Sequence, residues 1–289
     1  MQPPELKSLI HILATVATLT VAIWYTHMLT TQRPPPELRV VHRKPEVCIL
    51  IPTTSGGQPH WSTLEHTPLY QYPLQSIATT CEPANFTYRV LIGHDDDDPL
   101  FSSQPMHTAL RAWAARHLRF APLTIHPIRN RAHKPGPAMN NLSSIAHAAG
   151  CDYLYRINDD TELASPRWTS AFVAALAAFR PPNVGVVGPT CHEGNTAIMT
   201  HDFVHRTHRD IFPWHYPPEL TDWWLDDWIS QVYGPTNTLK LPGVVVRHHT
   251  VATRYAVAWG ADRLLPALVA RGNATIAQFR KTHSYVVPT

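Results

Sequence analysis

The chain has 289 residues and a formal net charge of +3, and 16 % of its residues are charged. This length allows one large α/β domain or two small ones. The mild charge balance shows no basic stripe, which argues against a nucleic-acid-binding protein. The 19 histidines raise the expectation of a metal-binding or acid–base site without identifying a residue.

The N-terminal segment from Leu9 to Leu29 is apolar. It is about as long as the roughly 20 residues that cross a bilayer as a helix. A buried amphipathic helix is the alternative, because histidines and threonines interrupt the run. No small-x-small cleavage site is evident, so we predict an uncleaved anchor rather than a signal peptide. We expect a tail and anchor over residues 1–30, a proline-rich extended stem over 31–45, and a folded domain over 46–289.

The orientation of this anchor is ambiguous. More basic residues follow the apolar segment than precede it, which by the positive-inside rule would place the folded domain in the cytosol. Three glycosylation sequons, at Asn85, Asn141 and Asn273, favour a lumenal domain instead. The four cysteines could form two disulfides in an oxidising lumen or remain as buried thiols, and their spacing matches no zinc motif.

Short apolar runs alternate with helical patterns through the folded domain. The expected buried strands are Val47–Thr54, Tyr88–Gly93, Leu123–Ile128, Tyr153–Ile157, Val184–Pro189 and Leu239–His249. The expected helices are Pro68–Thr80, Ala138–Gly150, one capped by Ser165, Asp222–Gly234, and one within Leu264–Arg280. This alternation predicts a mostly parallel sheet with helices on both faces. Ligands of such sheets bind beyond the carboxyl ends of the strands.

Two acidic runs lie at that edge. "INDDTE" begins at Ile157, where one predicted strand ends, and "IGHDDDDP" begins at Ile92, near the end of another. Crowded carboxylates repel one another unless a cation lies between them. Their hard oxygens suit Mg²⁺ or Mn²⁺. The alternative is a solvated acidic turn that caps the next helix.

The layout of residues 47–249 resembles the GT-A fold of nucleotide-sugar glycosyltransferases. The first strand ends in Pro and Thr, the second ends in acid, and the segment "KPGPAMNNLSSIAHAAGCDYLYRINDD" places an Asn-bearing helix before a strand that ends in an Asp-x-Asp-like triplet. The resemblance implies transfer of a sugar from a nucleotide-diphosphate donor, a UDP-sugar, to a hydroxyl of a glycan or glycoprotein, with Mn²⁺ or Mg²⁺ as cofactor. It also implies a type II membrane protein of the Golgi or ER with a lumenal domain.

By this resemblance, Asp160 of the triplet binds the metal and Asn158 contacts the ribose. One of His248 and His249 completes the metal site; they point to opposite sides of a strand, so we expect at most one to be a ligand and favour His248, with a surface or core histidine pair as the alternative. We expect Asp97 and Asp98 to form a solvated turn. The residues expected to bind the nucleotide sugar are Thr53, Thr54, Asp95, Asp96, Lys134, Asn140, Arg156, Asn158, Asp159, Glu193 and Asn195.

The segment "ELTDWWLDDWISQVYG" resembles the acidic pair that opens a helix near the acceptor in inverting members of the family. The resemblance implies that Asp227 is the general base and that Asp226 orients the acceptor. It predicts inversion at the anomeric carbon. Trp223 and Trp224 are expected to contact the acceptor sugar. The alternative is that the tryptophans belong to the core and the acidic pair caps the helix.

Three other functions deserve comparison. His201, His205 and His208 could hold zinc, but the Glu of the zinc-protease motif does not follow His201. A nucleotidyltransferase would need a basic, glycine-rich loop after the first strand, and "TTSGGQPHW" contains no Lys or Arg. A carbohydrate-binding or scaffold protein could keep the fold without turnover, although the acids at both the metal and base positions argue against such a loss.

Overall fold

The computed structural model describes residues 43–249 and 253–283. The chain divides into two units, residues 1–43 and 44–289, and the secondary structure described below belongs to the second. The predicted anchor, Leu9–Leu29, lies outside the described residues, as does most of the predicted stem. Among the residues that are described, no helix combines the length and apolar character needed to cross a membrane.

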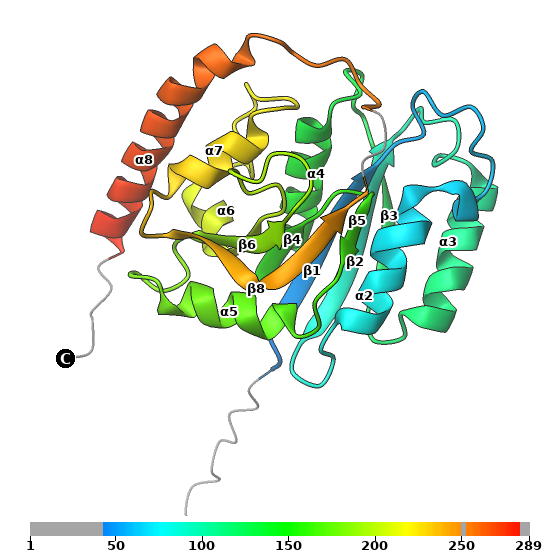
Figure 1. The fold of residues 1–289 in the computed structure, drawn as a ribbon, viewed down its shortest axis with the longest axis horizontal. Coiled ribbons are helices and arrows are strands. Elements are labelled where there is room, and N and C mark those ends of the chain that lie inside the picture. Colours follow the sequence, from blue (N-terminus) through cyan, green and yellow to red (C-terminus); the bar gives the residue numbers. More distant parts are fainter. Residues whose placement is uncertain (1–42, 250–252, 284–289) are drawn as a thin grey trace, which may run out of the picture. The chain divides into compact units, whose positions relative to one another are not determined.

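An eight-stranded sheet forms the centre of the second unit, with the order β3-β2-β1-β4-β7-β6-β8-β5 (Figure 1). Its strands are β1 (Glu46–Thr53), β2 (Thr87–Asp95), β3 (Leu123–Ile128), β4 (Tyr153–Arg156), β5 (Thr161–Leu163), β6 (Val186–Cys191), β7 (Phe203–His205) and β8 (Thr238–His248). Strands β3, β2, β1 and β4 are parallel, as are β6 and β8. The short strands β7 and β5 pair antiparallel with their neighbours, so the sheet is mixed.

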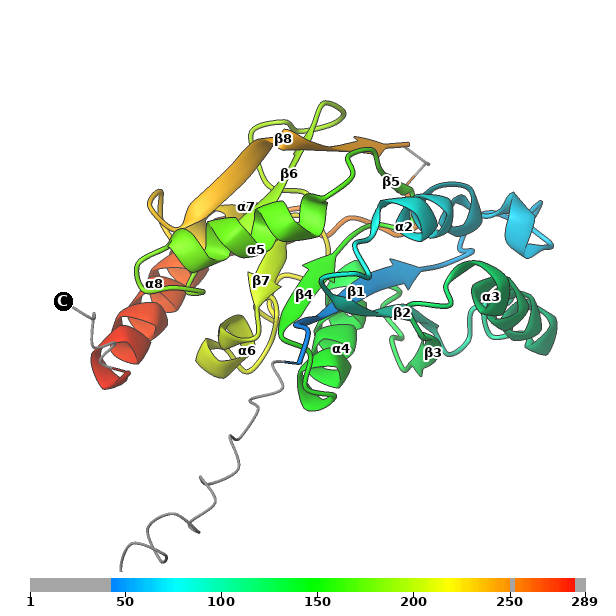
Figure 2. The same ribbon diagram turned by 90° about the horizontal axis from the view of Figure 1, so that it is seen from below.

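Helices cover both faces of the sheet (Figure 2). One face carries α2 (Gln75–Thr80), α3 (Gln104–His117) and α5 (Trp168–Ala178). The other carries α4 (Pro135–Ala148), α6 (Thr207–Ile211), α7 (Leu225–Val232) and α8 (Leu265–Thr282). Strand β1 shows why both faces are apolar: Val47, Ile49 and Ile51 pack in one core, Cys48 and Leu50 in the other, and all five are at most 1 % exposed.

All six predicted strands are confirmed within a few residues, whereas the three-residue strands β5 and β7 were not predicted. The predicted helix from Asp222 begins three residues later, because Trp224 has a left-handed backbone with a φ of 64°. Ser165 does not cap α5, because its hydroxyl accepts a hydrogen bond from the Val245 amide at 2.9 Å. Of the four cysteines, Cys48 and Cys151 form a disulfide between β1 and the residues before β4, while Cys81 and Cys191 are free.

The start of α4 fixes the segment that precedes α7. The Gly136 amide donates to the Thr221 carbonyl at 2.8 Å. A Cβ at position 136 would lie 2.8 Å from that oxygen and 2.9 Å from the Leu220 carbonyl oxygen, so only glycine allows this approach. Contact between the α4 turn and residues 220–221 therefore positions Asp222 and the residues that follow it.

Candidate functional site

Polar side chains gather where β4 ends and β8 runs alongside β5. Residues Asn158–Asp160 follow β4, and β5 begins at the next residue, Thr161. Antiparallel pairing of β5 with β8 aligns Thr161 with His248. The backbone therefore brings the acidic triplet beside the late histidines.

His248 faces Asp160, with its Nε2 atom 2.9 Å from Asp160 Oδ1. The hydrogen bond to Asp160 raises the pKa of His248. His249 points the other way: its Nε2 lies 2.8 Å from Glu162 Oε2, and its ring stacks on Tyr72 with centroids 3.8 Å apart. The opposite orientation of the two histidines is confirmed, and His248 is the one at the acidic triplet.

The Asp160–His248 pair fits a divalent ion. Adjacent ligands of an octahedral ion, each about 2.1 Å from it, lie roughly 3 Å apart, close to the observed 2.9 Å between the two ligand atoms. A carboxylate oxygen with an imidazole nitrogen is a donor set that suits Mn²⁺. The Asp160 side chain is 8 % exposed and that of His248 is 23 % exposed, and the Asp160 Oδ1 atom itself is buried.

Asp159 has a different role from its neighbour. Its carboxylate pairs with both terminal nitrogens of Arg254 and accepts a hydrogen bond from Thr53 Oγ1 at 2.6 Å. Arg254 also donates to the Thr54 carbonyl at 2.7 Å. Burial would lower the pKa of Arg254, but Asp159 raises it above its ordinary value, so the guanidinium stays charged. Arg254 was not predicted, and it places a cation beside the acidic triplet.

Arg156 lies behind the site rather than on its open face. Its side chain is 6 % exposed, donates to Asp226 and to the Thr200 carbonyl, and lies 3.8 Å from Asp202. A guanidinium held by two carboxylates is not available to a diphosphate. We therefore correct the predicted role of Arg156: it connects β4 to the first turn of α7.

The three histidines of the alternative zinc site are part of a hydrogen-bond network inside the protein. His201, His205 and His208 contact Thr161, Thr207 and Tyr233, respectively, at 2.6–2.7 Å. Burial lowers the pKa of His205 to about 4 and that of His208 to about 3, so both are neutral near pH 7. Because the three rings face separate partners, the geometry does not form the zinc site that was the alternative.

Asp202 is the anion of this network. It contacts His215 Nε2 at 2.7 Å and accepts a hydrogen bond from the Tyr216 hydroxyl. Burial would raise the pKa of Asp202, but His215 and Arg156 lower it to about 2. The carboxylate is thus charged at all ordinary pH values and balances Arg156.

Asp226 and Asp227 begin α7. Burial raises the pKa of Asp226 despite its ion pair with Arg156. Burial also raises the pKa of Asp227; among the described contacts, it has no ion pair. A carboxylate without a cation partner and with a raised pKa can accept a proton from a hydroxyl. Asp226, held by Arg156, cannot turn freely toward a substrate.

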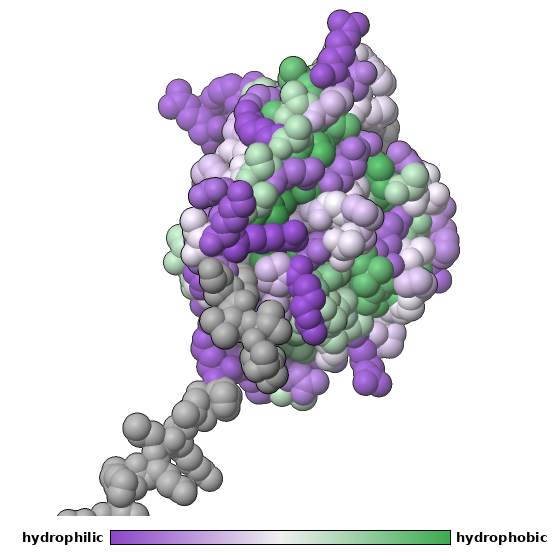
Figure 3. All heavy atoms as spheres, turned by 90° about the vertical axis from the view of Figure 1, so that its left-hand side faces the viewer, coloured by the Kyte–Doolittle hydropathy of each residue, from purple (hydrophilic) through white to green (hydrophobic). Residues whose placement is uncertain are grey.

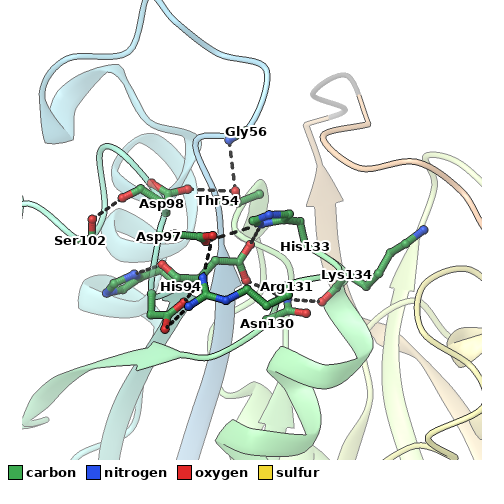
Figure 4. A network of polar contacts seen from close by, with 12 residues as sticks. Thr54, Gly56, His94, Asp97, Asp98, Ser102, Asn130, Arg131, His133 and Lys134 are labelled. Atoms are coloured by element: carbon green, nitrogen blue, oxygen red, sulfur yellow. Dashed lines mark hydrogen bonds and ion pairs between the residues drawn. The ribbon is translucent and has the colours of Figure 1, made fainter.

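The acidic run after β2 forms a second cluster (Figure 4). Buried Asp95 accepts a hydrogen bond from Asn130 Nδ2 at 2.7 Å and lies 2.8 Å from His133 Nδ1. Arg131 pairs with Asp96 and Asp97 at 2.9 and 2.7 Å. Ligand atoms of Asp95, Asp97 and His133 all lie within 4.8 Å of one another, so this cluster is a second candidate metal site. It already contains a cation, Arg131.

Asp98 does not form a solvated turn, contrary to the prediction. It is 4 % exposed and accepts hydrogen bonds from Thr54 Oγ1 and from the Ser55 amide and hydroxyl at 2.6–2.9 Å. These bonds join the end of β1 to the loop after β2. Thr54 is therefore engaged in structure, while Asp97, 42 % exposed, remains at the surface.

Some of the other predicted site residues are held by contacts within the protein, and others remain accessible to a ligand. Asn140 binds the backbone of residues 215 and 216 through three hydrogen bonds of 2.8–2.9 Å, so we correct its assignment to the nucleotide. Lys134 pairs with buried Asp222 at 2.6 Å. Glu193 lies at the site, accepting from the His248 amide at 3.2 Å. Asn158 is half-buried and Asn195 is exposed.

A shallow pocket elsewhere has no comparable chemistry. It lies between α8 and the segment after α6, and its lining includes Trp214, Glu219 and Arg271. Glu219 and Arg271 pair with each other at 2.8 Å. Figure 3, viewed from the side of α8, shows apolar side chains between hydrophilic ones on this surface. The pocket holds no histidine, and its carboxylate is already paired.

No protein-family model and no curated protein matches the sequence. The fold is similar to that of the mannosyltransferase PcManGT from Pyrobaculum calidifontis, solved in complex with GDP-Man and Mn²⁺, with a TM-score of 0.51, 14 % identity, and coverage of 97 % of this chain and 87 % of that one. TarS from S. aureus aligns with a TM-score of 0.50 and 11 % identity over 83 % of this chain and 44 % of TarS. The chain thus has the GT-A-type fold that its sequence resembles.

The contact of Arg156 with Asp226 and Asp202 predicts a large loss of stability on substitution. Arg156→Met should lower the free energy of unfolding by about 3–5 kcal/mol, because it leaves buried Asp202 and half-buried Asp226 without this cation. Arg156→Met combined with Asp226→Asn should recover part of that loss. Urea unfolding followed by circular dichroism measures both. The control Arg247→Met removes an exposed ion pair and should cost at most about 1 kcal/mol; an equally small effect at Arg156 would contradict the account.

Proposed function

We propose that the protein is a metal-dependent glycosyltransferase. It would move a sugar from a nucleotide-diphosphate donor to a hydroxyl of a glycan or glycoprotein. The observation that carries the proposal is the convergence of two acidic sites on a GT-A-type fold: the Asp160–His248 pair and the Asp226–Asp227 pair. Arg156, the last residue of β4, pairs with Asp226 of α7, and the triplet with Asp160 follows β4 directly.

Asp160 and His248 are the proposed metal ligands, and Mn²⁺ or Mg²⁺ fits their oxygen and nitrogen atoms. Such an ion supplies positive charge that stabilises a departing diphosphate. Arg254 lies beside the same triplet, where its pairing with Asp159 and the Thr54 carbonyl would hold the triplet in position rather than contact the diphosphate. Asn158 is left to hydrogen-bond the ribose, since Asp159 is occupied by Arg254 and Thr53.

We propose that Asp95 and its partners Asn130 and His133 bind the nucleoside at the end of β2. Their hydrogen bonds hold Asp95 in one orientation, which suits recognition of a base or ribose. A UDP-sugar is the proposed donor. The GDP-Man bound by the similar mannosyltransferase makes a GDP-sugar the alternative. Glu193 and Asn195 follow β6 and are proposed to contact the donor sugar.

Asp227 is the proposed general base. In this mechanism its carboxylate accepts the proton of the acceptor hydroxyl while that oxygen attacks the anomeric carbon and the bond to the diphosphate breaks. Direct attack from the opposite face inverts the anomeric configuration. Asp226 would orient the acceptor, with Arg156 holding it in place. A product that keeps the donor's anomeric configuration would exclude this mechanism.

We also propose that residues 9–29 anchor the enzyme in the membrane of the Golgi or ER, with the folded unit in the lumen. The Cys48–Cys151 disulfide is typical of oxidising compartments. Asn85 is exposed in a turn, where a glycan can be attached.

Protease digestion of sealed microsomes tests this orientation. We expect the folded unit to be protected from the protease, and its digestion would indicate a cytosolic orientation.

The role of Asp227 predicts a separation of catalysis from donor binding. Asp227→Asn should lower kcat by about 10²- to 10⁴-fold and leave the Kd for the nucleotide unchanged. Wild-type kcat/KM should fall as the pH drops through the pKa of Asp227, which lies above the ordinary aspartate value of about 3.9, because protonation removes the base. Release of UDP or GDP from a panel of nucleotide sugars with saccharide acceptors and Mn²⁺ measures this.

The matched control is Asp210→Asn, a change of an exposed aspartate on α6 that pairs with His147. It should retain wild-type rates and the same acidic limb. If the Asp227→Asn variant transfers sugar at the wild-type rate, Asp227 is not the general base. Absence of transfer by wild type from every donor, together with no nucleotide binding, would overturn the proposed function itself.

A further inference from the structure

Three tryptophans from two separate segments form an exposed aromatic surface, here named the tryptophan platform. It consists of Trp223 and Trp224, which precede α7, and Trp259, which precedes α8. The ring centroids of Trp223 and Trp259 are 5.0 Å apart, and each lies 6.2–6.3 Å from that of Trp224. Trp259 is 74 % exposed and Trp223 is 45 % exposed. Grouped exposed rings of this kind mark binding surfaces.

Buried Asp222 holds the two segments of the platform together. Its Oδ1 accepts a hydrogen bond from the Trp223 amide at 2.7 Å, and its Oδ2 accepts one from the Ala258 amide at 3.0 Å. Lys134 Nζ lies 2.6 Å from the same Oδ2. Because one carboxylate fixes the backbone next to Trp223 and Trp259, the rings are positioned before any ligand binds.

The platform adjoins the proposed base. Trp224 immediately precedes α7, whose first turn contains Asp226 and Asp227. Tyr255 comes from the same segment as Trp259, and burial together with Asp222 and Asp226 raises its pKa to about 12. A ligand on the three rings would therefore extend from the acceptor position of the active site.

We propose that the tryptophan platform binds the second sugar ring of an oligosaccharide acceptor, so that the enzyme elongates glycans of at least two sugar units. This inference rests on the proposed function. Pyranose rings have apolar C–H faces that pack on aromatic rings, and their hydroxyl groups suit the neighbouring carboxylates. The exposed rings of Trp223 and Trp259 offer more surface than one reacting sugar covers, while half-buried Trp224 packs against the core. Asp227 beside the rings has no ion pair among the described contacts, and its charge would repel anionic lipid headgroups.

The test compares Trp259→Ala with wild type in the full-length protein, using paired acceptors. The pairs are methyl β-N-acetylglucosaminide with chitobiose, methyl α-mannoside with mannobiose, and methyl β-galactoside with lactose. For the pair of acceptors to which the enzyme transfers sugar, Trp259→Ala should raise the disaccharide KM about five- to tenfold. It should leave both kcat and the monosaccharide KM unchanged. Trp259→Phe should recover most of the affinity. The control Leu264→Ala alters another exposed apolar residue and should change neither KM.

Equal KM changes for both members of a pair, or no change for either, would overturn the platform as a second-sugar site. If no donor supports transfer, the proposed function fails, but disaccharide binding followed by tryptophan fluorescence still tests the platform. Binding to wild type and not to Trp259→Ala would support it. Quenching of wild-type but not Trp259→Ala fluorescence by brominated phosphatidylcholine in reconstituted vesicles would assign the rings to lipid and overturn the proposal.

Discussion

The ion pair between Arg156 and Asp226 connects the two parts of the candidate site. Arg156 is the last residue of β4, three residues before Asp159, and Asp226 lies in the first turn of α7. A buried guanidinium is costly unless its partners are held in place, and the network around Asp202 supplies that constraint. The distance between the triplet at the end of β4 and the acids of α7 is thereby fixed by buried charge, not by a loop.

Charge pairing also separates the roles of acids that are close in sequence. Asp159 is paired with Arg254, Asp226 with Arg156, and Asp222 with Lys134. Each of these carboxylates holds a segment in position. Asp160 instead faces His248, and Asp227 has no ion pair among the described contacts; these are the two acids that we propose for metal binding and proton transfer. The paired cations also offset the repulsion between these neighbouring carboxylates.

Local pattern was enough to predict six of the eight strands, the opposite orientation of His248 and His249, and the position of the acidic triplet at the end of a strand, because these features depend only on neighbouring residues. It failed where the partner is distant in sequence. Asn140 binds a backbone 75 and 76 residues away, Asp98 binds the end of β1, and Arg254 lies 95 residues from Asp159. Nothing in the composition around these residues signals such contacts. Trp259 was likewise missed because the chain must fold to bring it beside Trp223.

The most direct test of the account is the location of the metal. Crystals of the protein grown with UDP and Mn²⁺ would be measured at the manganese absorption edge, and the anomalous difference map would show each bound ion. The account predicts a peak in contact with Asp160 and His248, next to the diphosphate. A peak at Asp95, Asp97 and His133, with none at Asp160, would contradict it and move the metal site to the end of β2.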